Sequence, residues 1–485
     1  MTAAVAVLIT SLSIAPLAAQ TPLGDSLWVA GSFAGAKVAY EQSLHDNPGN
    51  VRALYRLAIL ASWDSKVDSA LALLRDAREV EPAEPDVRLY QAKMYAWKGD
   101  YRASIVHFDS LIAEQPDNRD ARFGRAQARA WSGRYQDADR EFRAILETHP
   151  DDAETLVALA QLKQWQGRAD EAEHYATLAL AVAPNDRAAR DTRAQIRALR
   201  RPRLEVALGF GHDSDKNNAW WQNATVSFMA AAGLRAFASA GVMELSDPVQ
   251  SGTRLSGEIG ATYGTGNLSL TGAVGARKLR NDFGTDRSLG TWRASMSYRV
   301  SPGAGFGLGY AHYSFDETAF LVGNRIDIDE VSADADAELT PTLSLGVGAS
   351  IGFISDDNKR RSAVVALTQR LAQRFTVGLY GRVLGYDQKG TGYFSPDRFL
   401  TGEARGSYTY GVQRWEAKLS GGLGAQQVGK NGRAQSEWHA EARVARRWAT
   451  INEVALSGGF STSAVSSTTG AFRYYTAALS LRLGL

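Results

Sequence analysis

The sequence predicts a multidomain fold in which an α-helical repeat solenoid precedes a transmembrane antiparallel β-barrel. Two observations carry this prediction. Before Pro202 the sequence repeats every 34 residues, and after it apolar and polar residues alternate at every second position up to Leu485. The first period is typical of stacked helical hairpins, and the second is typical of strands with one apolar face. We therefore expect a solenoid at residues 21–200 and a barrel at 201–485, after a separate segment at 1–20.

The composition excludes several classes of site. The formal net charge is +2, which gives no reason to expect a nucleic acid partner. The chain has no cysteine, so it holds no disulfide and no thiolate-bound metal. No run of ~20 apolar residues follows the first twenty positions, so we expect no membrane-spanning helix. A barrel remains compatible, because each of its strands is only half apolar.

The segment Met1–Gln20 is apolar and ends in small residues. This pattern is typical of a secretory signal, which we expect to be cleaved near Ala18–Gln20. No Lys or Arg precedes the apolar stretch, which leaves the true start codon open. A buried first helix is the alternative interpretation.

The 34-residue period rests on residues whose properties suit helical hairpins. Glycine allows the turn after the first helix of each pair, and proline ends the second helix. A small residue lets the two helices approach, and a larger one four residues later fills the space beside it. The repeated positions are Pro48, Pro82, Pro116, Pro150 and Pro184; Trp63, Trp97, Trp131 and Trp165; Gly99, Gly133 and Gly167; Ala36, Ala70, Ser104, Ala138 and Ala172; and Tyr40, Leu74, Phe108 and Phe142.

This pattern resembles the tetratricopeptide repeat. The match covers about residues 28–185, as four full repeats and one preceding helix, and the polar segment Asp186–Arg200 is expected to form a capping helix. The resemblance implies an arm that binds a protein partner.

The tryptophan ladder Trp63, Trp97, Trp131 and Trp165 has two interpretations. We favour packing at the end of each first helix, because solenoids bury their periodic aromatic residues. The alternative is an exposed stripe suited to sugar rings or a partner peptide. The common repeat places its Trp near the start of the first helix, and the position found here is typical of repeats attached to YaiO-type outer-membrane barrels.

After Pro202, seven tight and eight longer connections separate sixteen predicted strands. Outer-membrane barrels have short periplasmic turns and longer outer loops. A soluble sandwich would also alternate, but its connections would not sort by length. We expect tight connections at Ala231–Gly233, Thr265–Gly266, Ser301–Gly303, Pro341, Ala372–Gln373, Gly411–Val412 and Ala449, and longer ones at His212–Trp220, Ser246–Ser251, Asn281–Ser288, Ser314–Asn324, Ser355–Lys359, Asp387–Arg398, Val428–Ala434 and Ser461–Gly470.

The polar phase of the strands predicts a charged barrel interior, wide enough for a water-filled channel. These charges could instead pair with one another and hold the barrel's shape. Asp334, Asp336 and Glu338 form an acidic row on one strand. This row would attract cations or amino sugars, unless arginines on neighbouring strands neutralise it. The candidate lumen-lining residues are Arg254, Glu258, Arg293, Arg299, Asp334, Asp336, Glu338, Arg382, Glu403, Arg405, Glu416, Lys418, Glu441 and Arg443.

We expect no catalytic residue, cofactor or metal. Asp213, Asp215 and Asn217 imitate the start of a calcium loop, but Asn218 stands where glycine is required. His439 lies two residues from a glutamate on either side, yet no nucleophile accompanies it.

The start of the barrel, Leu204–Phe228 (LEVALGFGHDSDKNNAWWQNATVSF), directly follows the repeats. This layout is similar to YaiO-type outer-membrane proteins, and also to the cellulose-synthase-associated outer-membrane subunit and the poly-N-acetylglucosamine porin. The resemblance implies a channel or assembly factor for exopolysaccharide export in the outer membrane, with the repeats in the periplasm. It implies contacts with lipid, a periplasmic protein and a polysaccharide. A non-conducting scaffold barrel is the alternative, and a barrel hydrolase a further one.

Overall fold

The structure is a computed structural model that describes residues 20–340, 342–372, 374–463 and 473–485. The expected signal segment lies outside these residues except for Gln20, as do Pro341 and Gln373 of two predicted turns and most of the loop Ser461–Gly470. No helix in the described part of the chain is long and apolar enough to cross a membrane. The chain divides into two compact units, one ending at Thr148 and one spanning His149–Leu485.

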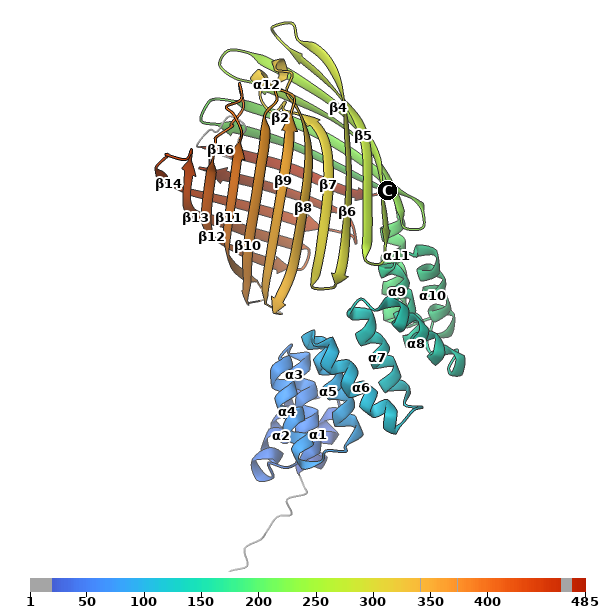
Figure 1. The fold of residues 1–485 in the computed structure, drawn as a ribbon. Helices are drawn as coiled ribbons and strands as arrows, with labels where there is room; N and C mark the ends of the chain where they lie inside the picture. Colours follow the sequence, from blue (N-terminus) through green and yellow to red (C-terminus); the bar gives the residue numbers. More distant parts are fainter. Residues whose placement is uncertain (1–19, 341, 373, 464–472) are drawn as a thin grey trace, which may run out of the picture. The chain divides into compact units, whose positions relative to one another are not determined.

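The first half of the chain is a series of helical hairpins (Figure 1). The predicted helical hairpins are thus confirmed, and one more helix, α1, begins before the range predicted for the repeats. The helices are α1 Gln20–Val29, α2 Phe33–Asp46, α3 Val51–Trp63, α4 Val67–Val80, α5 Pro85–Lys98, α6 Tyr101–Glu114, α7 Arg119–Trp131, α8 Tyr135–Thr148, α9 Ala153–Trp165, α10 Ala169–Val182 and α11 Arg187–Arg200. The first eight lie in the first unit, and α9–α11 lie in the same unit as the barrel.

The repeated positions pack as their chemistry predicts. The small residues Ala36, Ala70, Ser104, Ala138 and Ala172 are all fully buried. Their larger partners, such as Tyr40 and Phe108, are at most 1% exposed. The turn glycines adopt left-handed φ values between 74° and 89°. In the α3–α4 turn Ser65 takes this conformation instead, with a φ of 60°.

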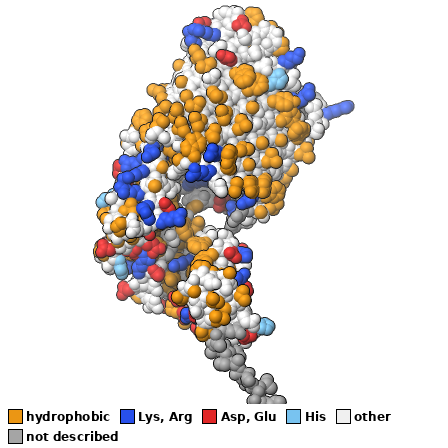
Figure 2. All heavy atoms as spheres, turned by 180° about the vertical axis from the view of Figure 1, so that it is seen from behind, with side chains coloured by type: hydrophobic (Ala, Val, Ile, Leu, Met, Phe, Trp, Pro, Cys, Tyr) orange, Lys and Arg blue, Asp and Glu red, His pale blue; other side chains and the backbone are white. Residues whose placement is uncertain are grey.

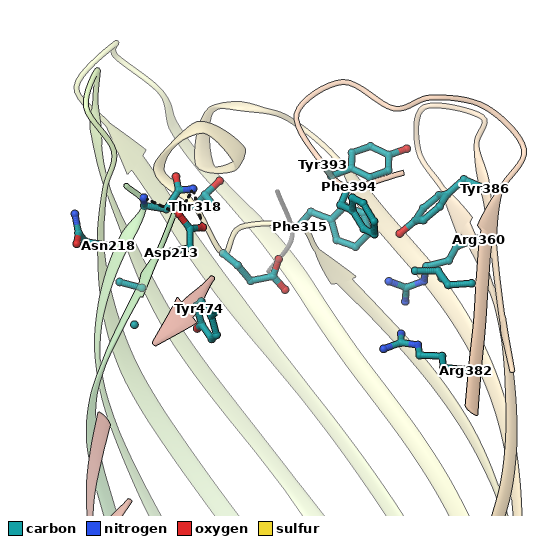
Figure 3. A pocket seen from close by; sticks show the side chains of 15 residues that line it. Asp213, Asn218, Phe315, Thr318, Arg360, Arg382, Tyr386, Tyr393, Phe394 and Tyr474 are labelled. Carbon is teal, nitrogen blue, oxygen red and sulfur yellow. Dashed lines mark hydrogen bonds between the residues drawn. The ribbon is translucent and has the colours of Figure 1, made fainter. Parts of the chain in front are cut away.

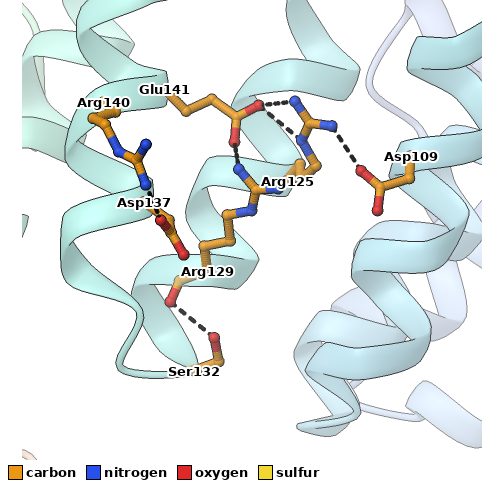
Figure 4. A network of polar contacts seen from close by, with 7 residues as sticks. All are labelled: Asp109, Arg125, Arg129, Ser132, Asp137, Arg140 and Glu141. Atoms are coloured by element: carbon orange, nitrogen blue, oxygen red, sulfur yellow. Dashed lines mark hydrogen bonds and ion pairs between the residues drawn. The ribbon is translucent and has the colours of Figure 1, made fainter.

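A buried carboxylate links α7 and α8 in the first unit (Figure 4). Glu141 accepts hydrogen bonds from Arg125 Nε at 2.8 Å and from Arg129 Nη1 at 2.9 Å. Arg125 also donates to Asp109 of α6 at 2.6 Å. Because Glu141 is only 7% exposed, its charge depends on these two guanidinium groups.

The second half is a closed antiparallel barrel of sixteen strands, as predicted. The first strand pairs with the last, from Arg203 opposite Gly484 to Asp213 opposite Tyr474. The strands are β1 Arg203–Asp213, β2 Asn218–Ala231, β3 Leu234–Ser246, β4 Ser251–Thr265, β5 Leu268–Asn281, β6 Asp286–Ser301, β7 Ala304–Ser314, β8 Asp327–Thr340, β9 Leu343–Ile354, β10 Lys359–Ala372, β11 Phe375–Tyr386, β12 Phe399–Val412, β13 Trp415–Val428, β14 Ala434–Arg447, β15 Glu453–Ser461 and β16 Tyr474–Gly484.

The two ends of the barrel differ. We call the end with the β2–β3, β4–β5 and similar short connections the turn end, and the opposite end the loop end. Several predicted long loops are shorter than expected, because their polar residues continue the strands: the β1–β2 loop is reduced to 214–217 and the β5–β6 loop to 282–285. The β7–β8 loop at 315–326 and the β11–β12 loop at 387–398 are long, as predicted.

The outward face of the barrel is apolar (Figure 2). Exposed aromatic residues lie near both ends of its strands. Ile259, Leu379 and Leu423 lie between these ends and are 63%, 63% and 68% exposed. Two aromatic girdles around an exposed aliphatic band are typical of a barrel that crosses lipid. The loop-end girdle contains Phe210, Trp220, Trp292, Tyr310, Phe353, Trp438, Phe460 and Tyr475, and the turn-end girdle contains Phe228, Tyr263, Tyr298, Phe306, Phe375, Tyr408, Tyr410 and Trp415.

The last repeat lies against the turn end of the barrel. If Gly167 and Gly233 each carried a Cβ atom, these atoms would lie 2.5 Å and 2.6 Å from the backbone carbonyl oxygen of Gly264. The contact therefore leaves no room for a side chain at either position. Arg235 of β3 donates a hydrogen bond to the Leu199 carbonyl oxygen of α11 at 2.5 Å. The sequence prediction placed the domain boundary where helix changes to strand, whereas the compact unit also includes this repeat.

We expect Gly167→Ala to detach the last repeat from the barrel rim. The added methyl group would meet the Gly264 carbonyl and would also strain a left-handed φ of 74°. Gly99→Ala is a matched control, because Gly99 has a φ of 89° at the same repeat position but open space around it. Limited proteolysis near Pro202 measures the effect. We expect faster cleavage of the Gly167 variant than of the Gly99 variant, and equal rates would contradict this contact.

Candidate functional site

The β7–β8 loop folds into the barrel at the loop end and is held there by one aspartate. Asp316 is fully buried and accepts hydrogen bonds from Arg254 of β4 at 2.7 Å and Arg277 of β5 at 2.8 Å. The hydroxyl of Ser314 donates a third hydrogen bond at 2.7 Å. Since both arginines lie in the inward phase of their strands, this contact places the loop in the interior of the barrel, against its wall.

A short helix, α12 (Ala319–Gly323), completes this loop. Thr318 caps it by accepting a hydrogen bond from the backbone N–H of Leu321 at 3.2 Å. Ala319 and Val322 pack on Leu245 and Leu279 of the wall, and all four are buried. The loop therefore has both a polar and an apolar attachment to the strands around it.

The β11–β12 loop, Asp387–Arg398, meets the first loop. The ring of Tyr393 lies 5.1 Å from Phe315 and 5.7 Å from Tyr386. Its hydroxyl donates to Asp356 at 2.8 Å and accepts from Asn358 Nδ2 at 2.8 Å. Burial, followed by the hydrogen bond to Asp356, raises the pKa of Tyr393. We call residues 315–326 and 387–398 together the plug.

A cavity of about 310 Å³ lies beside the plug, inside the loop end of the barrel (Figure 3). Arg360 of β10 and Arg382 of β11 project into it from one wall. Asn218 and Tyr474 line the opposite side, and the ring of Phe315 lies between the two walls. The cavity thus spans strands from both the beginning and the later part of the barrel.

A second cavity of about 430 Å³ adjoins the first, because Arg382 and Tyr474 line both. Here Arg405 donates to Glu403 at 2.5 Å and lies 3.3 Å from the ring of Tyr380. His439 lies 3.5 Å from Glu403. The two cavities therefore adjoin along the inner wall of the barrel next to the plug.

Many of the predicted lumen-lining charges meet across neighbouring or nearby strands. Arg293 pairs with Glu258 at 2.8 Å, and Arg443 pairs with Glu416 at 3.5 Å. Arg299 pairs with Asp336 of the acidic row, which neutralises the middle carboxylate. Among the described residues, Asp334, Glu338, Arg382, Lys418 and Glu441 form no ion pair. Pairing therefore accounts for part of the interior charge and leaves the rest available to solvent or ligand.

Two weaker candidates in the sequence are a calcium loop at Asp213–Asn217 and a catalytic role for His439, and the structure gives the contacts of both. The Asp213 carboxylate accepts hydrogen bonds from the backbone of Asp215 and Asn217, which folds the β1–β2 loop on itself. No group of three His, Cys, Asp or Glu side chains in the described segments could hold a metal ion. His439 Nδ1 lies 3.5 Å from a carboxylate oxygen of Glu403.

The tryptophan ladder is more exposed than packing alone requires. Trp63, Trp97 and Trp165 are 53%, 52% and 41% exposed, and Trp131 is half-buried. Trp63 packs edge-on against Phe33 at 4.9 Å. Burial of periodic aromatic residues, which the sequence favoured, is therefore incomplete, and one face of these rings is open to solvent.

Sequence reasoning missed Asp316, Arg277 and Arg360. Arg277 and Arg360 lie in the inward phase of their strands, so the alternation alone could have identified them. Asp316 lies in a loop, where no periodic pattern predicts which way a side chain points.

Comparisons with known proteins found one matching family model, in the helical half of the chain, and several similar solved structures. The tetratricopeptide-repeat family model matches residues 27–94, 98–154 and 132–196. A solved bacterial polysaccharide outer membrane secretin is 14% identical, and the match covers 59% of this chain and 99% of that chain with a TM-score of 0.48. A thermophilic tetratricopeptide-repeat protein of Thermus thermophilus is 23% identical over 37% of this chain and 98% of its own, with a TM-score of 0.34.

The type IV pilus biogenesis factor PilW is 18% identical over 37% of this chain and 91% of its own, with a TM-score of 0.31. No curated protein matches the sequence significantly. The chain is therefore one that joins tetratricopeptide repeats to a closed barrel of sixteen antiparallel strands.

Proposed function

We propose that this protein is a non-enzymatic outer-membrane channel that exports a polysaccharide, with its repeats in the periplasm. The observation that carries the proposal is a charged interior closed by an inward-folded plug, inside a barrel whose outer face is apolar. Such a barrel would place its aliphatic band in lipid and water in its lumen. The plug would close the lumen until a polymer displaces it.

The repeats support a binding role on the periplasmic side of the channel. Solenoids of this kind present extended surfaces to partners, and Trp63 and Trp97 of the repeats are 53% and 52% exposed. We propose that the repeats bring a periplasmic enzyme or the polymer itself to the turn end of the barrel.

Proteoliposomes test the proposal. The full-length protein is inserted into liposomes that contain a fluorescently labelled tetrasaccharide, and release of the label is followed over time. We expect slow release from liposomes with the protein and none from liposomes without it. The competing function is a non-conducting scaffold, which the extensive pairing of interior charges favours. No release from any variant, including those with a loosened plug, would establish the scaffold instead.

Location is tested separately. We expect the protein to fractionate with outer-membrane lipid and to need detergent for extraction. A chain that stays monodisperse in detergent-free buffer would contradict every function that depends on lipid.

A further inference from the structure

Arg382 is the interior cation that the barrel itself leaves unsatisfied beside the plug. Its neighbour Arg360 is balanced, because it donates to Glu330 and to the hydroxyl of Tyr313, each at 2.9 Å. Arg382 has no hydrogen bond or ion pair to any residue in the described part of the chain, and its buried Nε atom lacks an acceptor. A buried donor without an acceptor is costly unless water or a ligand satisfies it.

The position of Arg382 makes it accessible to anything that passes the plug. It lines both cavities, and its guanidinium group points into the first of them (Figure 3). A side chain shared by two adjoining cavities lies at their junction. A polymer that threads from one cavity to the other would therefore pass Arg382.

The rest of the first cavity suits a sugar better than a simple anion. Aromatic rings of Phe315 and Tyr386 offer flat apolar faces, and the hydroxyls of Thr318 and Tyr474 offer hydrogen bonds to sugar hydroxyls. A cavity of about 310 Å³ is also at the lower end of the size of small-ligand pockets. A monosaccharide unit has both an apolar face and a polar edge.

Two acids also line this cavity, and both lie on elements other than β10 and β11. Asp213 belongs to β1, where its carboxylate is engaged by its own loop, and Glu317 belongs to the plug. Because Arg382 of β11 is the cation of this wall that no ion pair balances, the cavity has one basic side. A planar guanidinium group binds a carboxylate through two parallel hydrogen bonds.

We propose that Arg382 binds the carboxylate of an acidic sugar unit, so that the exported polymer is a uronic-acid-containing polysaccharide. The proposal rests on the proposed export function for its polymer, and it adds the charge class of that polymer. The rings of the plug cover the sugar, and Arg360 on the neighbouring strand stays paired with Glu330.

Calorimetric titration of the detergent-solubilised full-length protein with tetragalacturonate tests the site. We expect Arg382→Gln to weaken binding about tenfold or more, as for the loss of a charged hydrogen-bonded pair. Arg382→Lys should retain part of the affinity, because a lysine keeps the charge but not the paired donors. Lys418→Gln is the matched control, since Lys418 is another unpaired interior cation that lines neither cavity.

The neutral tetrasaccharide cellotetraose separates charge from stacking. We expect it to bind more weakly than tetragalacturonate and to be insensitive to Arg382→Gln. Equal affinity of the wild type and the Arg382→Gln variant for tetragalacturonate would overturn the site, whether or not the barrel conducts. Arg382-dependent binding in a barrel that never releases sugar would instead overturn the export function and leave the site intact.

Discussion

Asp316→Ala is expected to convert a nearly closed barrel into an open one. The carboxylate of Asp316 is fully buried between two arginines, and its loss leaves Arg254 and Arg277 facing each other without a counter-charge. Removing one partner of a buried ion pair typically costs about 3–5 kcal/mol. A change of that size would alter the ratio of closed to open plug by about two orders of magnitude or more. Single-channel conductance in planar bilayers measures the result.

A disulfide provides the reverse experiment. Gly252 of β4 and Val322 of α12 are suitably placed, because an ideal Cβ atom on Gly252 would lie 3.4 Å from Cβ of Val322. This is close to the usual Cβ separation in disulfides of about 3.8 Å, and the chain has no cysteine of its own to interfere. In the Asp316→Ala background, oxidation of Gly252→Cys with Val322→Cys should restore the closed state, and reduction should reopen it.

Asp282→Ala is the control for the contact that Asp316 makes, because Asp282 is an aspartate of the β5–β6 loop whose carboxylate accepts hydrogen bonds from Ser251. It should leave conductance unchanged. If Asp316→Ala conducts no more than this control, the plug is a permanent part of the wall and not a gate.

Glu141→Ala is expected to destabilise the solenoid strongly. The side chain of Glu141 is 6% exposed, and its removal leaves Arg125 and Arg129 partly buried without their shared acceptor. We expect a loss of about 3 kcal/mol in the free energy of unfolding of the repeats, at the lower end of the range for a broken buried pair because both arginines keep some solvent contact. A urea titration of the full-length protein, followed by the helical circular dichroism signal, measures it.

The neighbouring pair Asp137 and Arg140 supplies the comparison (Figure 4). Its side chains are 40% and 79% exposed, so Asp137→Ala should cost about 1 kcal/mol or less. Equal losses for the two variants would mean that burial does not set the strength of these contacts.

The architecture could be predicted from the sequence because it is periodic. Each 34-residue repeat buries a small residue between its two helices at the same position, so one pattern identified the repeats from Ala36 to Ala172. Alternation in the strands likewise separated the outward face of the barrel from the interior, for example Leu423 from Lys418. Periodic features are repeated many times, and an error at one position does not change the prediction.

The candidate site was less predictable because the plug is not periodic. The direction of the β7–β8 loop depends on one carboxylate that meets arginines 62 and 39 residues away in the chain. The sequence left open whether Asp387–Arg398 folds inward, and only the packing of Tyr393 on Phe315 answers it. Likewise, that Arg382 lacks a counter-charge follows from the positions of acids on other strands, which no local pattern encodes.

The pairing of β1 with β16 also has a consequence for assembly. Every other strand joins its predecessor through a local hairpin, whereas this seam brings Arg203 to Gly484. Local hairpins form with little entropic penalty, but a seam between such distant residues must form last. Until then both margins of the curved sheet present unpaired N–H and C=O groups, which attract other chains. The nascent protein is thus prone to aggregation before the barrel closes. A chaperone or assembly factor that covers or pairs with these open edges would set the yield of folded protein.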